Sequence, residues 1–168
     1  EYNGSSWVSG GSMSIARRSG GSLGTQNSAL YAGGFSGFQH AETEEYDGSA
    51  WSNGGNIIQS RNSMGSSGTQ NASLISAGGT PTVVSCTEEY NGSSWSAGGA
   101  LINARNNFAG ALNGTQNSFV AFGGVDSGAT NYTEEYDGTT FTTQAGLSTS
   151  RLSLGGAGIQ SAALAFGG

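Results

Sequence analysis

The sequence predicts an all-β fold in which one short unit of antiparallel strands is repeated four times. Glu–Tyr pairs recur through the 168 residues at spacings of 44, 44 and 46, starting at Glu1, Glu45, Glu89 and Glu135. Five positions after each tyrosine comes an aromatic residue, and ten positions later an arginine: Trp7 and Arg17, Trp51 and Arg61, Trp95 and Arg105, Phe141 and Arg151. Self-similarity at a fixed period indicates a repeat architecture.

Turn signals divide each unit into short strands. The runs between them are rich in Val, Thr, Tyr and Trp, which favours strands over helices. One tight turn separates each tyrosine from its aromatic, at Asn3-Gly4, Asp47-Gly48, Asn91-Gly92 and Asp137-Gly138. A second follows each arginine, at Gly24-Thr25, Gly68-Thr69, Gly114-Thr115 and Gly158-Ile159. Asn-Gly and Asp-Gly suit the positive φ of hairpin turns, so we expect four antiparallel strands per unit.

Four antiparallel strands at a period near 45 are typical of one β-propeller blade. The chain starts with the outer two strands of a blade and finishes with the inner two. As a single repeat domain it divides into a half-blade at 1–11, blades at about 12–55, 56–99 and 100–145, and a half-blade at 146–168. Small inner strands such as Arg18-Ser19-Gly20-Gly21-Ser22 suit a crowded axis. We predict a four-bladed ring, closed by pairing the N-terminal outer strands with the C-terminal inner strands. The alternative is a piece of a longer array.

The order of landmarks within a unit resembles the kelch family. In that family an arginine opens the inner strand, an apolar strand ends in a glycine pair, and Tyr and Trp lie on the outer two strands. The glycine pairs of this chain are Gly33-Gly34, Gly78-Gly79, Gly123-Gly124 and Gly167-Gly168. The chain departs from the family in its period, which is shorter than the roughly 50 residues of kelch. It also has Phe141 in place of Trp and Gln144-Ala145 in place of two glycines. The WD40 class lacks support because there is no Gly-His or Trp-Asp signature.

The amino-acid sequences of three motifs are similar to those of kelch-like repeats in virion appendage and tail-fibre proteins of phages. The matching stretches are TEEYNGSSW, NGTQNS and AFGG. This resemblance implies a virion-surface or extracellular location and a role in host recognition.

Charge and composition exclude several other classes. The net charge is −6, and all five basic residues are arginine. A nucleic-acid binder needs a basic face, and no apolar run has the length of a membrane span. We therefore expect neither nucleic-acid binding nor membrane insertion. The single cysteine, Cys86, is interpreted as a small strand residue. With one cysteine and one histidine the chain cannot form an ordinary zinc site, and we expect no metal and no cofactor.

The paired carboxylates are interpreted as structural. Neighbouring strand residues point to opposite faces, so Glu44-Glu45, Glu88-Glu89 and Glu134-Glu135 do not converge on a substrate. Instead, we expect each repeat glutamate to contact an arginine, with Arg61, Arg105 and Arg151 as the partners. The one histidine, His40, could act as the base of a catalytic triad only with a nucleophilic serine, and no serine lies in a Gly-x-Ser-x-Gly nucleophile elbow. The sequence therefore predicts no enzymatic activity.

Candidate binding residues come from comparing the copies with one another. The hairpin turns barely vary, whereas the connection between the glycine pair and Thr-Glu-Glu varies strongly. Variable loops on a rigid frame are a common place for recognition, and aromatic and amide side chains suit sugars or protein surfaces. The candidates are Phe35, Phe38, His40, Asp126, Asn131 and Tyr132. The expected partner is a glycan or surface protein of a host cell, or other subunits of a virion or surface assembly. The alternative is a purely architectural propeller whose loops vary because nothing constrains them.

Overall fold

The computed structural model describes residues 1–111 and 113–168, and it confirms the all-β prediction. The described residues form four antiparallel sheets of two to four strands and no helix. None of them therefore belongs to a helix that is long and apolar enough to cross a membrane.

Fourteen strands make up these sheets. The first sheet contains β1 (Gly21–Thr25), β2 (Ser28–Ala32), β3 (Thr43–Tyr46) and β4 (Trp51–Asn53). The second contains β5 (Gly65–Thr69), β6 (Ala72–Gly79), β7 (Val83–Tyr90) and β8 (Trp95–Gly98). The third contains β9 (Ala109–Gly110), β10 (Phe119–Phe122), β11 (Thr133–Tyr136) and β12 (Phe141–Gln144). The fourth contains β13 (Gly155–Ile159) and β14 (Ala162–Phe166).

The strands of each complete sheet lie in sequence order, so every neighbour is joined by a hairpin or a short loop. Equivalent residues pair in each sheet: β2 and β3 set Ala29 opposite Tyr46, and β10 and β11 set Phe119 opposite Tyr136. The predicted turns between Tyr and Trp are present, and Gly48 has φ +92°. Asp47 stabilises its turn by accepting the Ser49 and Ala50 amides through Oδ1, at 2.8 and 2.9 Å.

The innermost strands of all four sheets surround one cavity of about 240 Å³, which is lined by Ser22, Ser66, Gly110 and Gly156 among others. Beside it, one residue of each sheet region has a left-handed φ of 51–59°: Ser19, Ser63, Asn107 and Ser153. Their backbones are hydrogen-bonded in succession. The Ser63 amide donates to Ser19 O (2.7 Å), Asn107 to Ser63 O (3.2 Å) and Ser153 to Asn107 O (2.8 Å). These bonds therefore link the four sheet regions in series beside the cavity.

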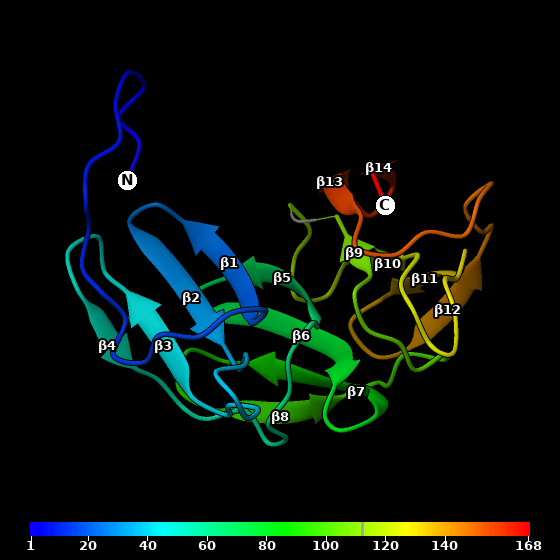
Figure 1. Ribbon diagram of the computed structural model, residues 1–168, viewed down its shortest axis with the longest axis horizontal. Coiled ribbons are helices and arrows are strands. Elements are labelled where there is room, and N and C mark those ends of the chain that lie inside the picture. Colours follow the sequence, from blue (N-terminus) through cyan, green and yellow to red (C-terminus); the bar gives the residue numbers. More distant parts are fainter. Residues whose placement is uncertain (112) are drawn as a thin grey trace.

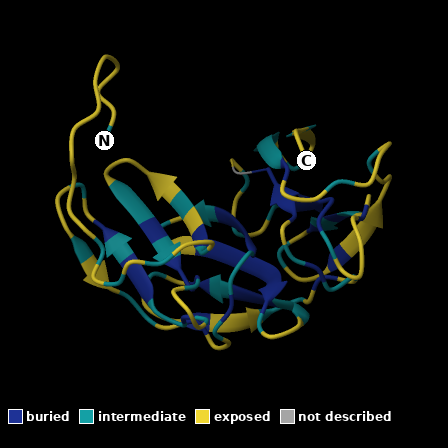
Figure 2. Cartoon of the chain, viewed as in Figure 1, coloured by how far each residue is buried: buried dark blue, intermediate teal, exposed yellow. Residues whose placement is uncertain are grey.

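Buried hydrophobic residues form clusters that join successive sheets, and Figure 2 shows strong burial along the central strand β6. Between the first two sheets the cluster includes Leu30, Ile75 and Trp95. Between the next two it includes Leu74, Phe119 and Phe141. Phe141 replaces the tryptophan of the other copies, yet its ring lies 4.7 Å from that of Tyr136, close to the 4.9 Å between Tyr90 and Trp95. The packing of the repeat is thus preserved although the residue at this position changes.

An arginine–glutamate ion pair is buried in each complete sheet. The pairs are Arg17–Glu44, Arg61–Glu88 and Arg105–Glu134. This confirms the expected contact for Arg61 and Arg105. For Arg151 the prediction is wrong among the described residues, because its guanidinium donates to Gly167 O at 3.0 Å instead of to a carboxylate.

Each ion pair also holds backbone from several segments. Arg105 donates through Nε to Gly123 O (2.9 Å) and through a terminal nitrogen to Asn103 O (3.0 Å). Glu134 accepts the backbone amides of Ile102 (2.6 Å) and Asn103 (3.2 Å). The pair therefore fixes the connection entering the sheet, the end of β10 and strand β11 at a single point.

The glycine pair of the second unit differs from its predicted position. Gly34, Gly78 and Gly124 donate equivalent amide bonds to Arg61 O, Arg105 O and Arg151 O. The structural pair is therefore Ala77-Gly78, with Gly79 one position beyond it. Ala77 adopts φ +53°, which an alanine tolerates poorly, whereas Gly78 has φ +109° and a Cβ there would lie 2.6 Å from Asn62 O. Alanine is therefore accepted at the first position of this pair, whereas in the first unit a Cβ at Gly33 would lie 2.6 Å from Arg61 O.

Two side-chain contacts recur at each interface between sheets. A tyrosine hydroxyl donates to a glutamate of the preceding unit, from Tyr90 to Glu45 and from Tyr136 to Glu89, both at 2.6 Å. A turn glutamine donates to two carbonyl groups of the preceding sheet. Gln116, for example, bonds Ser73 O (3.0 Å) and Tyr90 O (2.8 Å). These contacts set how each sheet lies on its neighbour.

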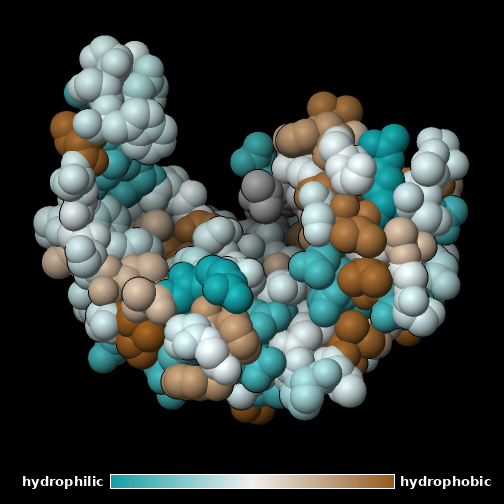
Figure 3. Space-filling view, viewed as in Figure 1, coloured by the Kyte–Doolittle hydropathy of each residue, from teal (hydrophilic) through white to brown (hydrophobic). Residues whose placement is uncertain are grey.

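The predicted ring closure is not formed in this structure. The sheets trace an open arc, with the N-terminal segment and β13–β14 on opposite sides of its mouth (Figure 1). The surface is hollowed between them (Figure 3). The segment 1–11 is held by the first sheet, where Tyr46 donates to Glu1. The residues that follow it are held as well, because Glu44 accepts the Ser14 amide at 2.7 Å. Its only internal bridge, Tyr2 to Trp7, belongs to no sheet, and β13–β14 remains two-stranded.

Replacing Arg105 with alanine should lower the free energy of unfolding by about 3–5 kcal/mol, because it leaves Glu134 charged, buried and unpaired. Thermal and urea denaturation followed by circular dichroism measure the loss. Arg18→Ala is the matched control, since Arg18 is exposed and contacts only the Phe35 ring, and it should cost less than about 1 kcal/mol. Equal losses in the two variants would contradict a special role for the buried pair.

Replacing Tyr90 with phenylalanine should weaken the interface and flatten its response to alkaline pH. Burial, followed by the hydrogen bond to Glu45, raises the pKa of Tyr90 to about 12, against about 10 in an unfolded chain. The tyrosine therefore stabilises the fold fully below pH 10, and the contribution is lost as pH rises toward 12. Tyr90→Phe should cost about 1–3 kcal/mol at pH 8 and show a shallower loss between pH 10 and 12. Tyr132→Phe, at a ring 37% exposed, is the control and should leave both measurements unchanged.

Candidate functional site

The variable connections lie at one end of the sheets, together with the segments that lead from one sheet into the next. Bridges join Arg18 to Phe35 and Thr130 to Arg151, each linking an incoming segment to a variable connection. The hairpin turns between Tyr and Trp lie at the other end of the same strands. We call Gly34–Glu42 the first variable loop and Gly124–Tyr132 the third variable loop.

These two loops share a set of backbone hydrogen bonds despite unrelated side chains. They differ at the tip, where Gly37 has φ +110° and the equivalent Ser127 is not left-handed. His40 N donates to Gly34 O and Thr130 N donates to Gly124 O, both at 2.9 Å. Bridges at Phe35–Gln39 and Val125–Ala129 mark the same turn in each loop. His40 and Thr130 are therefore equivalent positions. The corresponding stretch of the second sheet differs, because β6 and β7 continue as a hairpin around Thr80 and Thr82.

The first loop presents Phe38 at its surface. This side chain is 62% exposed, and its ring centroid lies 4.5 Å from that of His40, which is buried. Phe35 is half-buried beneath the Arg18 guanidinium, 5.3 Å from its ring centroid. Of the three predicted residues, Phe38 is the one available to a partner.

His40 is held by two polar side chains of its own loop. Ser36 Oγ lies 2.6 Å from His40 Nε2, and Glu42 Oε2 lies 2.9 Å from His40 Nδ1. Backbone amides, together with His40, hold the pKa of Glu42 below its ordinary value. The order of groups matches a serine nucleophile, its base and an orienting carboxylate. Acyl transfer also needs free amides for the oxyanion, but the Ser36 amide is already donated to Phe38 O at 3.2 Å. The arrangement braces the loop.

The third loop forms a polar pocket of about 270 Å³ that brings together Asp126, Asn131 and Tyr132. Tyr132 is 37% exposed, and the Arg105 guanidinium lies 5.9 Å from its ring centroid. Asn131 donates to Leu147 O at 3.2 Å. The amides of Ser127 and Gly128 lower the pKa of Asp126, so its carboxylate is charged at neutral pH. None of the residues that line this pocket comes from the first loop.

Sequence reasoning missed five further residues of this pocket, among them the polar Ser127, Thr130 and Ser150. Ser150 comes from the segment between β12 and β13, directly before Arg151. Thr130 is 6% exposed, and its hydroxyl has no hydrogen-bond partner among the described residues. Counting residues from the glycine pair of each loop would have shown that Thr130 occupies the position of His40.

The other groups considered from the sequence have structural partners. Within each carboxylate pair the two side chains face opposite ways, as predicted, since Glu44 meets Arg17 and Glu45 meets Tyr90. Cys86 lies in β7, as predicted, and donates to Gln59 Oε1 at 3.0 Å. Burial raises the pKa of this thiol. In the part of the chain that the structure describes, no three His, Cys, Asp or Glu side chains gather as metal ligands.

Comparison with known proteins adds no relative. No protein-family model matches the sequence, and no curated protein matches it. The functional argument therefore depends on the geometry of this chain and on the resemblance carried by its motifs.

Proposed function

We propose that the four sheets are blades of a kelch-like propeller, and that residues 1–8 form the outer half of the fourth blade. The left-handed residues support this proposal, because one from each sheet region lines a single pocket. The interface contacts support it as well, since the same Tyr–Glu bond repeats from sheet to sheet.

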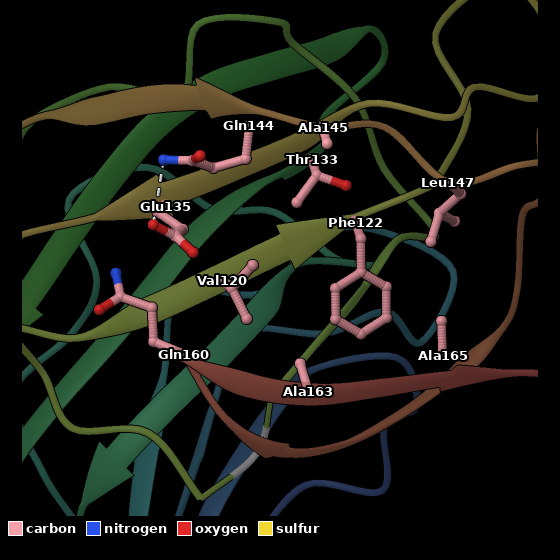
Figure 4. Close-up of a pocket in the computed structure, with 10 residues that line it drawn as sticks. All are labelled: Val120, Phe122, Thr133, Glu135, Gln144, Ala145, Leu147, Gln160, Ala163 and Ala165. Carbon is pink, nitrogen blue, oxygen red and sulfur yellow. Dashed lines mark hydrogen bonds between the residues drawn. The ribbon is translucent and has the colours of Figure 1, made fainter.

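In this proposal the two outer strands of the fourth blade bind next to β14. A pocket of about 330 Å³ lies there between the third sheet and β14, and it is lined by Glu135, Gln144, Phe122 and Ala163 among others (Figure 4). Glu135 is equivalent to Glu45 and Glu89, which each accept a tyrosine hydroxyl. By the register of the other sheets, Tyr2 belongs opposite Ala163. Tyr2 and Trp7 are 47% and 79% exposed in the open form, so closure would bury both rings.

A disulfide tests this closure. In a Cys86→Ser background, Glu1→Cys combined with Leu164→Cys sets two thiols opposite each other in the predicted register. Oxidation should give a cross-linked monomer, visible as faster migration on a non-reducing gel. Glu1→Cys with Ala162→Cys, two residues out of register, is the control and should cross-link poorly. A cross-linked dimer, or no difference between the pairs, would contradict closure within one chain.

We further propose that the protein is a non-catalytic recognition module on a virion fibre or microbial surface, which binds a glycan or a protein through its variable loops. One observation carries this proposal: the two loops keep the same backbone hydrogen bonds while presenting different side chains, with Phe38 exposed in one and a polar pocket in the other. The rest of the repeat keeps its side chains as well as its backbone. The resemblance to repeats of phage appendage proteins supports the location.

A purely architectural role is the second candidate. It is favoured by exposed apolar side chains on the unpaired β13–β14 sheet and the N-terminal segment, among them Leu164, Phe166 and Trp7. Copies of the chain, or other subunits of an assembly, would bury such side chains by packing against them.

Glycan-array binding separates the two candidates. The wild-type protein should bind at least one surface glycan, and Phe38→Ala or Tyr132→Ala should each weaken binding at least about tenfold, as expected for an aromatic anchor. Ile159→Ala is the control, because Ile159 is 49% exposed at the opposite end of the sheets. Absence of any ligand, together with assembly that tolerates all three changes, would favour the architectural role.

A further inference from the structure

Arg151 is the one repeat arginine that pairs with no carboxylate among the described residues. Its backbone is nevertheless placed as in the other units, because Arg151 O accepts the Gly124 amide at 2.8 Å and an equivalent bond reaches the backbone of Arg105. Its guanidinium donates to Gly167 O at 3.0 Å, which corresponds to the bond from Arg105 to Gly123 O. A guanidinium has five N–H donors, so Arg151 keeps several for a further partner.

Backbone amides from the segment just before the arginine complete the carboxylate site in the other units. Ile102 and Asn103 donate to Glu134 at 2.6 and 3.2 Å, and the equivalent amides of the second unit donate to its glutamate at the same two distances. In the fourth unit these positions are Ser148 and Thr149. Both residues are exposed, and neither amide donates to another described residue. The fourth unit therefore presents two amides and a guanidinium, the donors that bind a carboxylate elsewhere in this chain.

The register of the sheets shows where a matching carboxylate would come from. Glu134 lies in β11 opposite Ala121 in β10. The residue of β14 that corresponds to Ala121 is Ala165, because each is followed by Phe and Gly. Beyond its pairing with β13, β14 has no neighbouring strand among the described residues. A strand that adds to β14 in the register of the other sheets would therefore bring the side chain opposite Ala165 to the Arg151 site.

The N-terminal segment does not supply this carboxylate. In the proposed closure Tyr2 lies opposite Ala163 and Glu1 lies opposite Leu164, so Glu1 points to the other face of the sheet. Glu1 already accepts the Tyr46 hydroxyl, which is the interface role of the second glutamate in the other units. A partner for Arg151 therefore requires the first glutamate of the full Thr-Glu-Glu-Tyr motif.

The pocket beside β14 fits a second side chain of the same motif. In the complete sheets the motif tyrosine donates to a glutamate of the preceding unit, as Tyr136 does to Glu89. The corresponding glutamate for the fourth unit is Glu135, which lines the pocket of about 330 Å³ (Figure 4). One added strand would thus place its first glutamate on Arg151 and its tyrosine on Glu135.

We propose that β14 binds the outer-strand hairpin of another subunit built from the same repeat, and that Ser148, Thr149 and Arg151 select the first glutamate of its Thr-Glu-Glu-Tyr motif. Main-chain bonds to β14 supply affinity, and the carboxylate fixes the register. This inference depends on the proposed blade arrangement and specifies the partner of its fourth blade. Residues 1–8 compete for the same edge without the ion pair, so the hairpin is the tighter of the two.

The test uses a fluorescently labelled peptide with the sequence of residues 87–97, TEEYNGSSWSA, and fluorescence anisotropy with the full chain. The parent peptide should bind. Its Glu88→Gln version should bind at least about tenfold more weakly, because it leaves the arginine without a charged partner. This comparison leaves the protein unchanged, so it is independent of any effect on folding.

Protein variants and amide signals locate the contact. Arg151→Gln should abolish the difference between the two peptides. Arg18→Gln removes the same charge at an exposed arginine and should preserve the difference. In 1H–15N spectra of the wild-type protein, the Ser148 and Thr149 signals should shift with the parent peptide and much less with Glu88→Gln. The oxidised protein with Glu1→Cys and Leu164→Cys should not bind the peptide, because its own segment then occupies the edge.

The outcomes separate this inference from the blade arrangement on which it depends. Equal binding of the two peptides to wild type would overturn the carboxylate site, and so would a difference that persists in Arg151→Gln. Binding to the cross-linked protein would overturn the location at β14. Absence of peptide binding together with efficient cross-linking would overturn the added hairpin and leave the blade arrangement standing, whereas failure of both would overturn both.

Discussion

The buried arginine–glutamate pair is the interaction on which each repeat depends. Two opposite charges removed from water need further hydrogen bonds to their remaining donors and acceptors. The third pair meets this need best, because Arg17 and Arg61 each keep a buried guanidinium nitrogen without a hydrogen-bond partner among the described residues, whereas Arg105 does not. In the third sheet this requirement draws in the Ile102 and Asn103 amides and the carbonyl oxygens of Asn103 and Gly123. One ion pair thereby positions three backbone segments that are otherwise joined by loops. The variable loops begin directly beyond this point, which explains how they keep the same backbone hydrogen bonds with different sequences.

The sequence was sufficient to predict the repeated strands because their signals are local. Asn-Gly and Asp-Gly dipeptides form their turns from neighbouring residues alone, and Asp47 shows how the side chain caps its own hairpin. The arginine–glutamate pairing was predictable for a related reason, since one residue of each kind recurs per unit. The interface tyrosines were not assigned partners, because Tyr90 and Glu45 are 45 residues apart and belong to different sheets.

Other equivalences between the units are visible only in their three-dimensional hydrogen bonds. Ala77-Gly78, and not Gly78-Gly79, takes the place of the other glycine pairs, because the Gly78 amide donates to Arg105 O as the Gly124 amide donates to Arg151 O. The equivalence of His40 and Thr130 is likewise visible only in the amide bonds to Gly34 O and Gly124 O. Asp126, Asn131 and Tyr132 were identified as variable polar and aromatic residues. Thr130 was missed because a threonine before Asn-Tyr has no local signal of burial.

The chain of backbone hydrogen bonds beside the cavity has an evolutionary consequence. Ser63 donates to Ser19, Asn107 to Ser63 and Ser153 to Asn107, so each bond of this series joins neighbouring units. A duplicated unit would meet the same kind of backbone donors and acceptors on both sides. Whole-unit duplication is therefore a simple route by which such an array gains length, while each loop continues to diversify separately.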